Sequence, residues 1–127
     1  MLENVGDMPV FLKEILKEED FTEEKIKNSA IYRNLDMSKK DILKDEIVNL
    51  KEKFNQSFNK INGNTTLQIF LDYQESMNWI LDNLIISIDE ANMEKVAALR
   101  LIGNKLKEEV DNLVIRLISS YNINQSI

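Results

Sequence analysis

The sequence contains no cysteine and no histidine among its 127 residues. Without cysteine there is no disulfide, no thiolate metal site and no cysteine nucleophile. Without histidine the chain lacks the commonest general base and the commonest ligand of transition metals. The sequence also has no phosphate-binding loop or glycine-rich turn. We therefore expect a protein that is not an enzyme, with no catalytic residues, no metal and no cofactor.

Basic residues are outnumbered, with 16 lysines and arginines against 22 acidic residues and a net charge of −6. Nucleic-acid binding draws most of its affinity from basic side chains on phosphates, so this balance predicts no nucleic-acid partner. No apolar run approaches the ~20 residues of a membrane-spanning helix. The N-terminus also lacks the basic segment and cleavage site of a signal peptide. We expect a cytoplasmic protein that contacts no membrane.

Proline and glycine are scarce, with one proline and three glycines in the chain. Few boundaries for strands and turns remain, and the apolar residues follow helical spacing throughout. Isoleucine, asparagine and lysine are abundant, which is typical of an AT-rich genome and indicates a bacterial or phage origin. The sequence predicts one all-α domain over residues 1–127. We expect a small bundle of two or three long antiparallel helices with short N-terminal helices packed on them.

Residues 7–36 are predicted to form the short N-terminal helices. Asp7 is a suitable N-cap for the first, because the single proline follows in the first turn, where a missing N–H costs nothing. Thr22 is the expected N-cap of the second, which runs to about the end of this range. Phe21 and Ile26 have the spacing of a hydrophobic staple at its start.

Residues 38–121 are predicted to form the long-helix bundle, and 122–127 a loose tail. Ser38 followed by Asp41 resembles a capping box at the start of the first long helix, and Gly63 is placed to end it. Two further helices are expected over 66–90 and 93–121. The last of them carries a seam with the alternating three- and four-residue steps of coiled coils: Val96, Leu99, Gly103, Leu106, Val110, Leu113 and Leu117.

The junction between the last two helices has two interpretations. No proline or glycine lies between Ile88 and Met93, so one helix of more than ~50 residues is formally possible. We favour a break at residues 89–92 with Asn92 as the cap, because a compact domain requires the chain to turn back. The predicted core then contains Phe54, Phe70, Met77, Leu81, Leu84, Leu99, Leu106, Val110, Leu113 and Leu117.

The only tryptophan, Trp79, lies in a stretch without any lysine or arginine between Lys60 and Lys95. On a helical wheel, Trp79 and Ile86 fall outside the apolar arc of their helix. Acidic side chains share that side, and tryptophan is enriched in interface hot spots. One hypothesis is a surface that binds a basic or amphipathic helix, formed by Asp72, Glu75, Trp79, Asp82 and Ile86. The alternative is that the first forty residues cover Trp79, which then belongs to the core.

Two functional hypotheses follow. The first is a non-enzymatic protein-binding module, of the adaptor, chaperone or inhibitor kind, that contacts a helical segment of another protein through the acidic face. The second is a structural homodimer, whose bundle is completed between chains through the seam at 96–117. Gly103 lies within that seam and would permit close approach of a neighbouring backbone. Composition and spacing do not decide between them.

Overall fold

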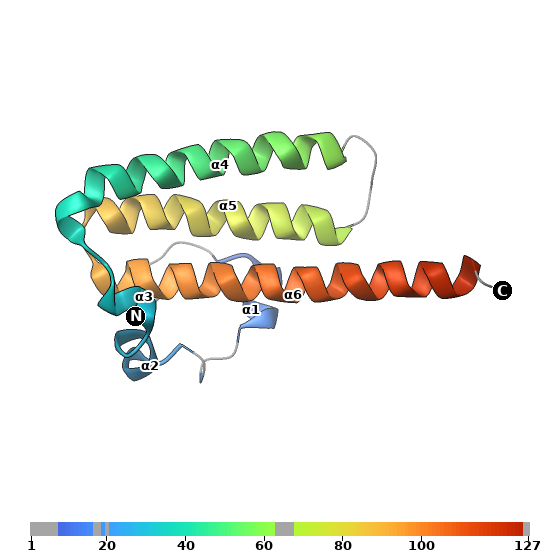
Figure 1. Cartoon of the computed structure of the whole chain (residues 1–127), viewed down its shortest axis with the longest axis horizontal. Coiled ribbons are helices and arrows are strands. Elements are labelled where there is room, and N and C mark those ends of the chain that lie inside the picture. The colour runs from blue at the N-terminus through green and yellow to red at the C-terminus, as the bar shows by residue number, and fades with distance from the viewer. Residues whose placement is uncertain (1–7, 17–18, 20, 63–67, 126–127) are drawn as a thin grey trace.

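The computed structural model describes residues 8–16, 19, 21–62 and 68–125, with side chains described for 8–16, 19, 21–58 and 68–112. Within these ranges the secondary structure is helical, which confirms the all-α prediction. Three long helices follow a set of short N-terminal ones (Figure 1). The elements are α1 (Val10–Ile15), α2 (Glu23–Lys27), α3 (Ala30–Arg33), the 3₁₀ helix η2 (Met37–Lys39), α4 (Lys40–Asn62), α5 (Gln68–Asp89) and α6 (Met93–Gln125).

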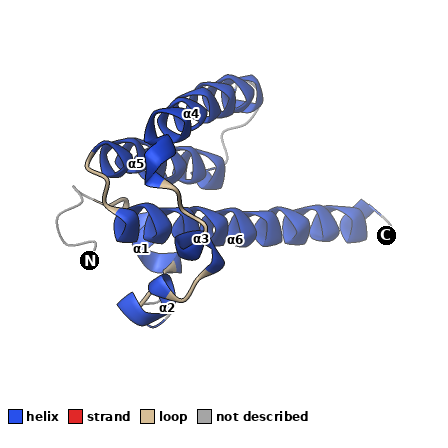
Figure 2. Cartoon of the chain, turned by 60° about the vertical axis from the view of Figure 1, so that its left-hand side comes forward, coloured by secondary structure: helices blue, strands red, loops and turns tan. Residues whose placement is uncertain are grey.

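The three long helices lie side by side with α5 in the middle (Figure 1). Helix α5 packs along both α4 and α6, whereas α4 and α6 hardly touch each other in the described part of the chain. The short helices α1, α2 and α3 gather against the N-terminal half of α6 (Figures 1 and 2). Both views also show α6 extending past the ends of α4 and α5 toward the C-terminus.

The main hydrophobic core lies between α5 and α6 and is closed by Leu12 of α1. The predictions for Leu81, Leu84, Leu99, Leu106 and Val110 are confirmed, since all five side chains are buried. Three other predicted core residues are only half-buried: Phe54, Phe70 and Met77. Leu113 and Leu117 lie outside the described side chains.

A second, smaller cluster lies on the opposite side of α6, where Ala97 and Ala98 pack with Ile26 of α2. Phe21 packs on the same cluster, as expected of a staple with Ile26. Helix α6 therefore buries two faces, one against α5 and one against the N-terminal helices. Helical spacing alone does not predict the second face, because alanine contributes weakly to an apolar pattern.

The N-terminal helices differ in detail from the prediction. Thr22 is the N-cap of α2, and its hydroxyl accepts the backbone N–H of Lys25 at 3.3 Å. The predicted single helix is divided in two, because the Ser29 hydroxyl accepts the N–H of Tyr32 at 3.2 Å and caps a new helix. Pro9 is the N-cap residue of α1. Asp7 lies outside the described residues.

The predicted cap at the start of the first long helix is also wrong. Asp36, and not Ser38, is the capping side chain, because its carboxylate accepts the Ser38 N–H at 3.0 Å and the Ser38 hydroxyl. That hydroxyl donates to Asp36, so Ser38 does not form the expected capping box with Asp41. The hydrogen bonds from Ser38 hold the pKa of the Asp36 carboxyl below its usual value. The predicted stop at Gly63 lies outside the described residues.

The expected turn between α5 and α6 is present. The N–H of Asn92 donates to the carbonyl of Ser87 and that of Ala91 to Ile88, both at 3.0 Å. These two bonds define a Schellman motif, which places Ala91 in the left-handed region with φ 54°. The side chain of Asn92 then accepts the N–H of Lys95 at 3.2 Å and caps α6, as predicted.

The C-terminal residues differ from the expected loose tail, because α6 continues to Gln125 and includes residues 122–125. No proline or glycine follows Gly103 in the sequence, so no residue there breaks the backbone hydrogen-bond pattern of the helix. In the part of the chain that the structure describes, no helix combines the length and the apolar character needed to cross a membrane.

Candidate functional site

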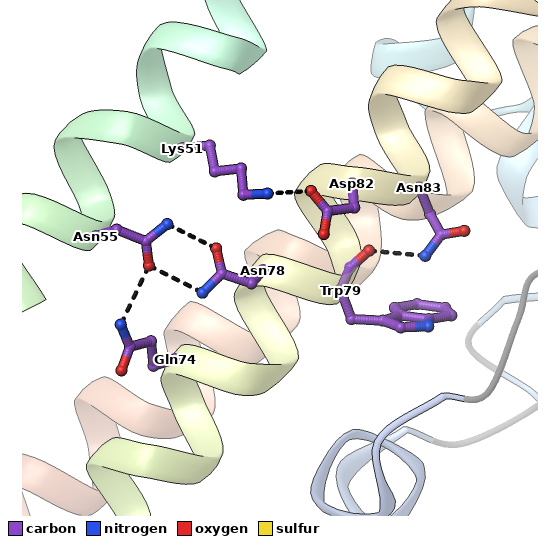
Figure 3. Close-up of polar contacts among 7 residues, drawn as sticks. All are labelled: Lys51, Asn55, Gln74, Asn78, Trp79, Asp82 and Asn83. Atoms are coloured by element: carbon purple, nitrogen blue, oxygen red, sulfur yellow. Dashed lines mark hydrogen bonds and ion pairs between the residues drawn. The ribbon is translucent and has the colours of Figure 1, made fainter.

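The five residues of the predicted acidic surface all lie on α5, but their side chains point in different directions. Trp79 is half-buried and packs against the main core cluster. Its indole is directed toward the N-terminal segment that carries α1 (Figure 3). Of the two interpretations of Trp79, this packing favours the one in which N-terminal residues cover it. Its backbone carbonyl accepts the Asn83 amide at 2.8 Å.

The acidic residues around Trp79 also point in different directions. Asp82 turns toward α4 and forms an ion pair with Lys51 (Figure 3). Asp72 accepts a hydrogen bond from the Gln68 amide at 2.9 Å. Glu75 and Ile86 are exposed, Ile86 to 52 %. The structure therefore leaves a narrow exposed strip between two packed sides, and Trp79 is not at the centre of an open patch.

A larger concave site is formed by the three long helices together. It is a groove of about 670 Å³ with α5 as its floor and α4 and α6 as its walls. We call it the α4–α6 groove. Leu50 of the α4 wall is 52 % exposed there. Its lining residues are Leu35, Leu43, Glu46, Ile47, Leu50, Phe54, Tyr73, Met77, Ile80, Leu81, Leu84, Ile88, Val96, Leu99, Arg100, Gly103, Asn104 and Lys107.

Beside the groove, α4 meets α5 partly through polar side chains. Asn55 and Asn78 exchange amide hydrogen bonds of 2.8 and 2.9 Å, and Gln74 donates to Asn55 at 3.1 Å (Figure 3). Such a half-buried amide cluster fixes the register of the two helices. Leu43 and Ile47 pack against the main core cluster and also line the groove, whereas Leu50 is exposed there.

Two ion pairs add to this polar seam between α4 and α5. Lys44 and Asp89 lie 3.0 Å apart near one end of the helices, and Lys51 pairs with Asp82 farther along. Their side chains are between one-third and about half exposed, so each contributes little to stability. Their spacing along α4 nevertheless keeps the same side of α4 against α5. The apolar side next to it remains open to the groove.

Aromatic rings close the end of the groove where Phe54 and Tyr73 face each other. Tyr73 stacks on Phe58 with ring centroids 5.8 Å apart and an interplanar angle of 6°. Phe54 lies 5.5 Å from Tyr73 and 5.4 Å from Phe58, again between centroids. Burial raises the pKa of the Tyr73 hydroxyl, and the nearby Asp111 carboxylate raises it further. Tyr73 is therefore neutral at physiological pH.

Gly103 lies in the groove at the boundary between the α6 wall and the α5 floor. A Cβ atom at this position would meet the Ile80 Cγ2 atom at 3.7 Å, an ordinary van der Waals distance. Gly103 therefore meets a side chain and no neighbouring backbone within the described part of the chain, and close approach of a second chain there stays a prediction. Within the chain, the glycine only leaves space in the groove.

Sequence reasoning missed the groove because its α4 wall carries the same spacing as a buried face. Leu43, Ile47 and Leu50 follow helical steps, and nothing in that pattern says whether the partner helix belongs to the same chain. One signal pointed toward it. The apolar arc of α5 is wide enough for two neighbours, and α4 covers part of that arc with amides.

No group of three or more acidic side chains in the described part of the chain is arranged to hold a metal ion. Comparison of the chain with models of protein families, with curated proteins and with solved structures gave no match. The groove and its lining residues are therefore the basis for a functional proposal.

Proposed function

We propose that this protein is a non-enzymatic protein-binding module that holds an amphipathic helix of another protein in the α4–α6 groove. The observation that carries the proposal is an apolar groove left open between two helices of a bundle. Its volume, about 670 Å³, is lined mainly by aliphatic and aromatic side chains. Binding of an amphipathic helix to such a groove is a common mode of peptide recognition.

The dimensions of the groove fit a helix. Its lining residues extend from Leu43 to Phe54 on α4 and from Val96 to Lys107 on α6. Each span corresponds to ~17 Å at 1.5 Å per residue, or about three turns of a bound helix. A helix in this position would pack on α4, α5 and α6 together and complete a four-helix bundle. An elongated apolar floor favours this occupant over a compact small molecule.

We prefer this groove to the acidic face of α5 as the binding surface. Trp79, the predicted anchor on that face, already packs against the main core cluster. Leu50, by contrast, is half exposed on the groove wall. Burial of such a residue by a partner contributes ~25 cal/mol per Å² of apolar surface. A partner would therefore bury more apolar surface in the groove than on the strip beside Trp79.

The test uses a display library of amphipathic helices about twelve residues long, matched to the groove length. Selected peptides are titrated against wild type, Leu50→Asp and Val48→Asp by fluorescence anisotropy. Val48 lies on the same helix with 44 % of its side chain exposed but does not line the groove, so it is the matched control. We expect Leu50→Asp to weaken binding at least ten-fold and Val48→Asp to leave it unchanged. No selected peptide, or equal losses in both variants, would contradict the proposal.

The second candidate, a homodimer, is favoured by one observation: α6 projects beyond α4 and α5 and continues to Gln125 (Figure 1). A projecting helix is available to a second chain. Sedimentation over a concentration series distinguishes the two candidates. A monomer that binds peptides supports the module, whereas a dimer that dissociates in Leu50→Asp would assign the groove to a second copy of the chain.

A further inference from the structure

The walls of the α4–α6 groove carry opposite charges. On α6, Arg100 and Lys107 line the groove two helical turns apart, with Asn104 between them. Among the described residues of α4, Glu46 is the charged one that lines the groove. All four of these side chains are exposed. A bound helix would therefore have a basic wall along one flank and an acidic residue along the other.

The two basic side chains on the α6 wall are not used within the fold. Neither Arg100 nor Lys107 forms an ion pair with any residue in the described ranges. Elsewhere in the described part of the fold some lysines, such as Lys27 and Lys44, pair with carboxylates, and others do not. In a chain of net charge −6, both cations beside the apolar groove are therefore available to a carboxylate of a partner.

We infer that the partner of this protein is an amphipathic helix whose flank next to α6 is acidic. The inference rests on the proposed function, because it gives the chemistry of the helix held in the same groove. An acidic residue on the partner would meet Arg100, and a second one about two turns along the same flank would meet Lys107. The opposite flank, beside Glu46, carries neutral or basic residues. Charge complementarity of this kind fixes the orientation of a bound helix.

One acidic residue limits where the partner's charges can lie. Asp111 follows Lys107 by one turn of α6, so an acidic side chain comes next along that helix. Acidic residues of the partner are therefore favoured along the part of α6 from Arg100 to Lys107 and disfavoured beyond it. The charge pattern thus specifies a register as well as a flank.

The test compares two peptides with the same apolar face, one with glutamates and one with lysines on the flank predicted to lie against α6. On wild-type protein at low salt, we expect the glutamate peptide to bind about ten-fold more tightly, since two attractive pairs replace two repulsive ones. This ratio should shrink at about 0.5 M salt, where exposed charges are screened. The apolar contribution to binding remains.

Charge reversal on the protein completes the experiment. Arg100→Glu combined with Lys107→Glu is expected to reverse the preference, so that the lysine peptide binds more tightly. Arg33→Glu is the matched control, because Arg33 is an exposed arginine on α3 outside the groove. Equal binding of both peptides to wild type, or a control that shifts the ratio as much as Arg100→Glu does, would overturn the inference.

The outcomes separate this inference from the proposed function. If both peptides bind equally and Leu50→Asp abolishes both, the groove holds helices without a charge preference and only the inference fails. If neither peptide binds, the proposed function fails as well. Circular dichroism of each variant confirms that the helices remain folded, so a loss of binding is not a loss of structure.

Discussion

The α5–α6 pair and the α4–α5 pair are built from different chemistry. Between α5 and α6 the contacts are aliphatic and fully buried, as at Leu99 and Leu106, which are both 0 % exposed. Between α4 and α5 the contacts also include amides, ion pairs and partly exposed rings, and the α4 aliphatic residues Leu43 and Ile47 are only half-buried. Phe58 is the one buried apolar side chain of α4 among those described. The first pair has the composition of a core, whereas the second has that of an interface.

If the α4–α6 groove binds a helix as proposed, stability and binding belong to different helix pairs of the fold. The N-terminal helices cover the α6 side of the aliphatic pair and complete its core, as Leu12 and Ile26 show. In the described residues the α4–α6 groove stays open beside the α4–α5 pair, and Leu50 is half exposed in it. A module that must bind a helix needs such an incomplete face, and it needs a core elsewhere that keeps the face in place.

The largest expected effect tests the aliphatic pair. Leu106→Ala is expected to lower the free energy of unfolding by about 2–5 kcal/mol, because it leaves a cavity in a fully buried site. Leu50→Ala is the matched comparison on α4, and we expect it to cost less than about 1 kcal/mol because the side chain is half exposed. Urea denaturation measures both. Similar losses in the two variants would mean that the groove wall contributes to the core.

The next effect concerns the cover supplied by the N-terminal helices. Trp79→Ala is expected to cost about 2–3 kcal/mol, less than a fully buried aromatic residue, because Trp79 is only half-buried. Tryptophan emission of the wild type should be blue-shifted and poorly quenched by acrylamide. Ile86→Ala, on the same helix but 52 % exposed, should change stability little. An unaffected Trp79→Ala would restore the acidic face of α5 as a candidate surface.

A moderate effect is expected at the polar seam between α4 and α5. Asn55→Ala removes the central residue of the amide cluster and leaves the Asn78 side chain without its partner, which should cost about 1–2 kcal/mol. Gln56→Ala, one position along on the exposed side of α4, should cost almost nothing. Adding Asn78→Ala to Asn55→Ala should then cost less than the sum of the single losses. Additive losses would show that water replaces these bonds.

Gly103→Ala is expected to stabilise the fold, unlike the substitutions above. It should raise the free energy of unfolding by about 1 kcal/mol, because alanine is the better helix former. The added methyl group finds an ordinary contact with Ile80 at 3.7 Å. The same methyl occupies space in the α4–α6 groove, so peptide affinity should fall while stability rises. A destabilised variant would show that α5 and α6 approach more closely than this contact allows.

The sequence predicted the elements of the fold better than the assignment of their faces. The three long helices, the Thr22 and Asn92 caps and the aliphatic seam as far as Val110 followed from spacing and capping chemistry. The groove did not, because an apolar stripe has the same spacing whether it packs on a helix of the same chain or on another protein. The orientation of α4 depends on contacts between Asn55 and Asn78, which are 23 positions apart. Helical periodicity does not encode such pairings.

The smallest expected effect is the change of stability with pH near neutrality. The hydrogen bond from Lys27 lowers the pKa of Glu23, and those from Ser38 lower that of Asp36. Their contributions are present above the ordinary carboxyl pKa and are lost only as pH falls through the lower folded values. Burial raises the pKa of Tyr73 above its usual value of 10.0. Its contribution is present below that value and is lost as pH rises through the folded one.

All three shifts therefore move titration away from neutrality, and a chain without histidine has few other groups that titrate there. We expect the melting temperature to change by less than about 2 °C between about pH 6 and 8. Above about pH 10 the loss should be smaller in Tyr73→Phe, which would place the alkaline titration in the aromatic end of the groove. A steep change between pH 6 and 8 would instead reveal a carboxyl group with a strongly raised pKa. Such a group is a candidate general acid or base, and the protein would then have to be tested as an enzyme.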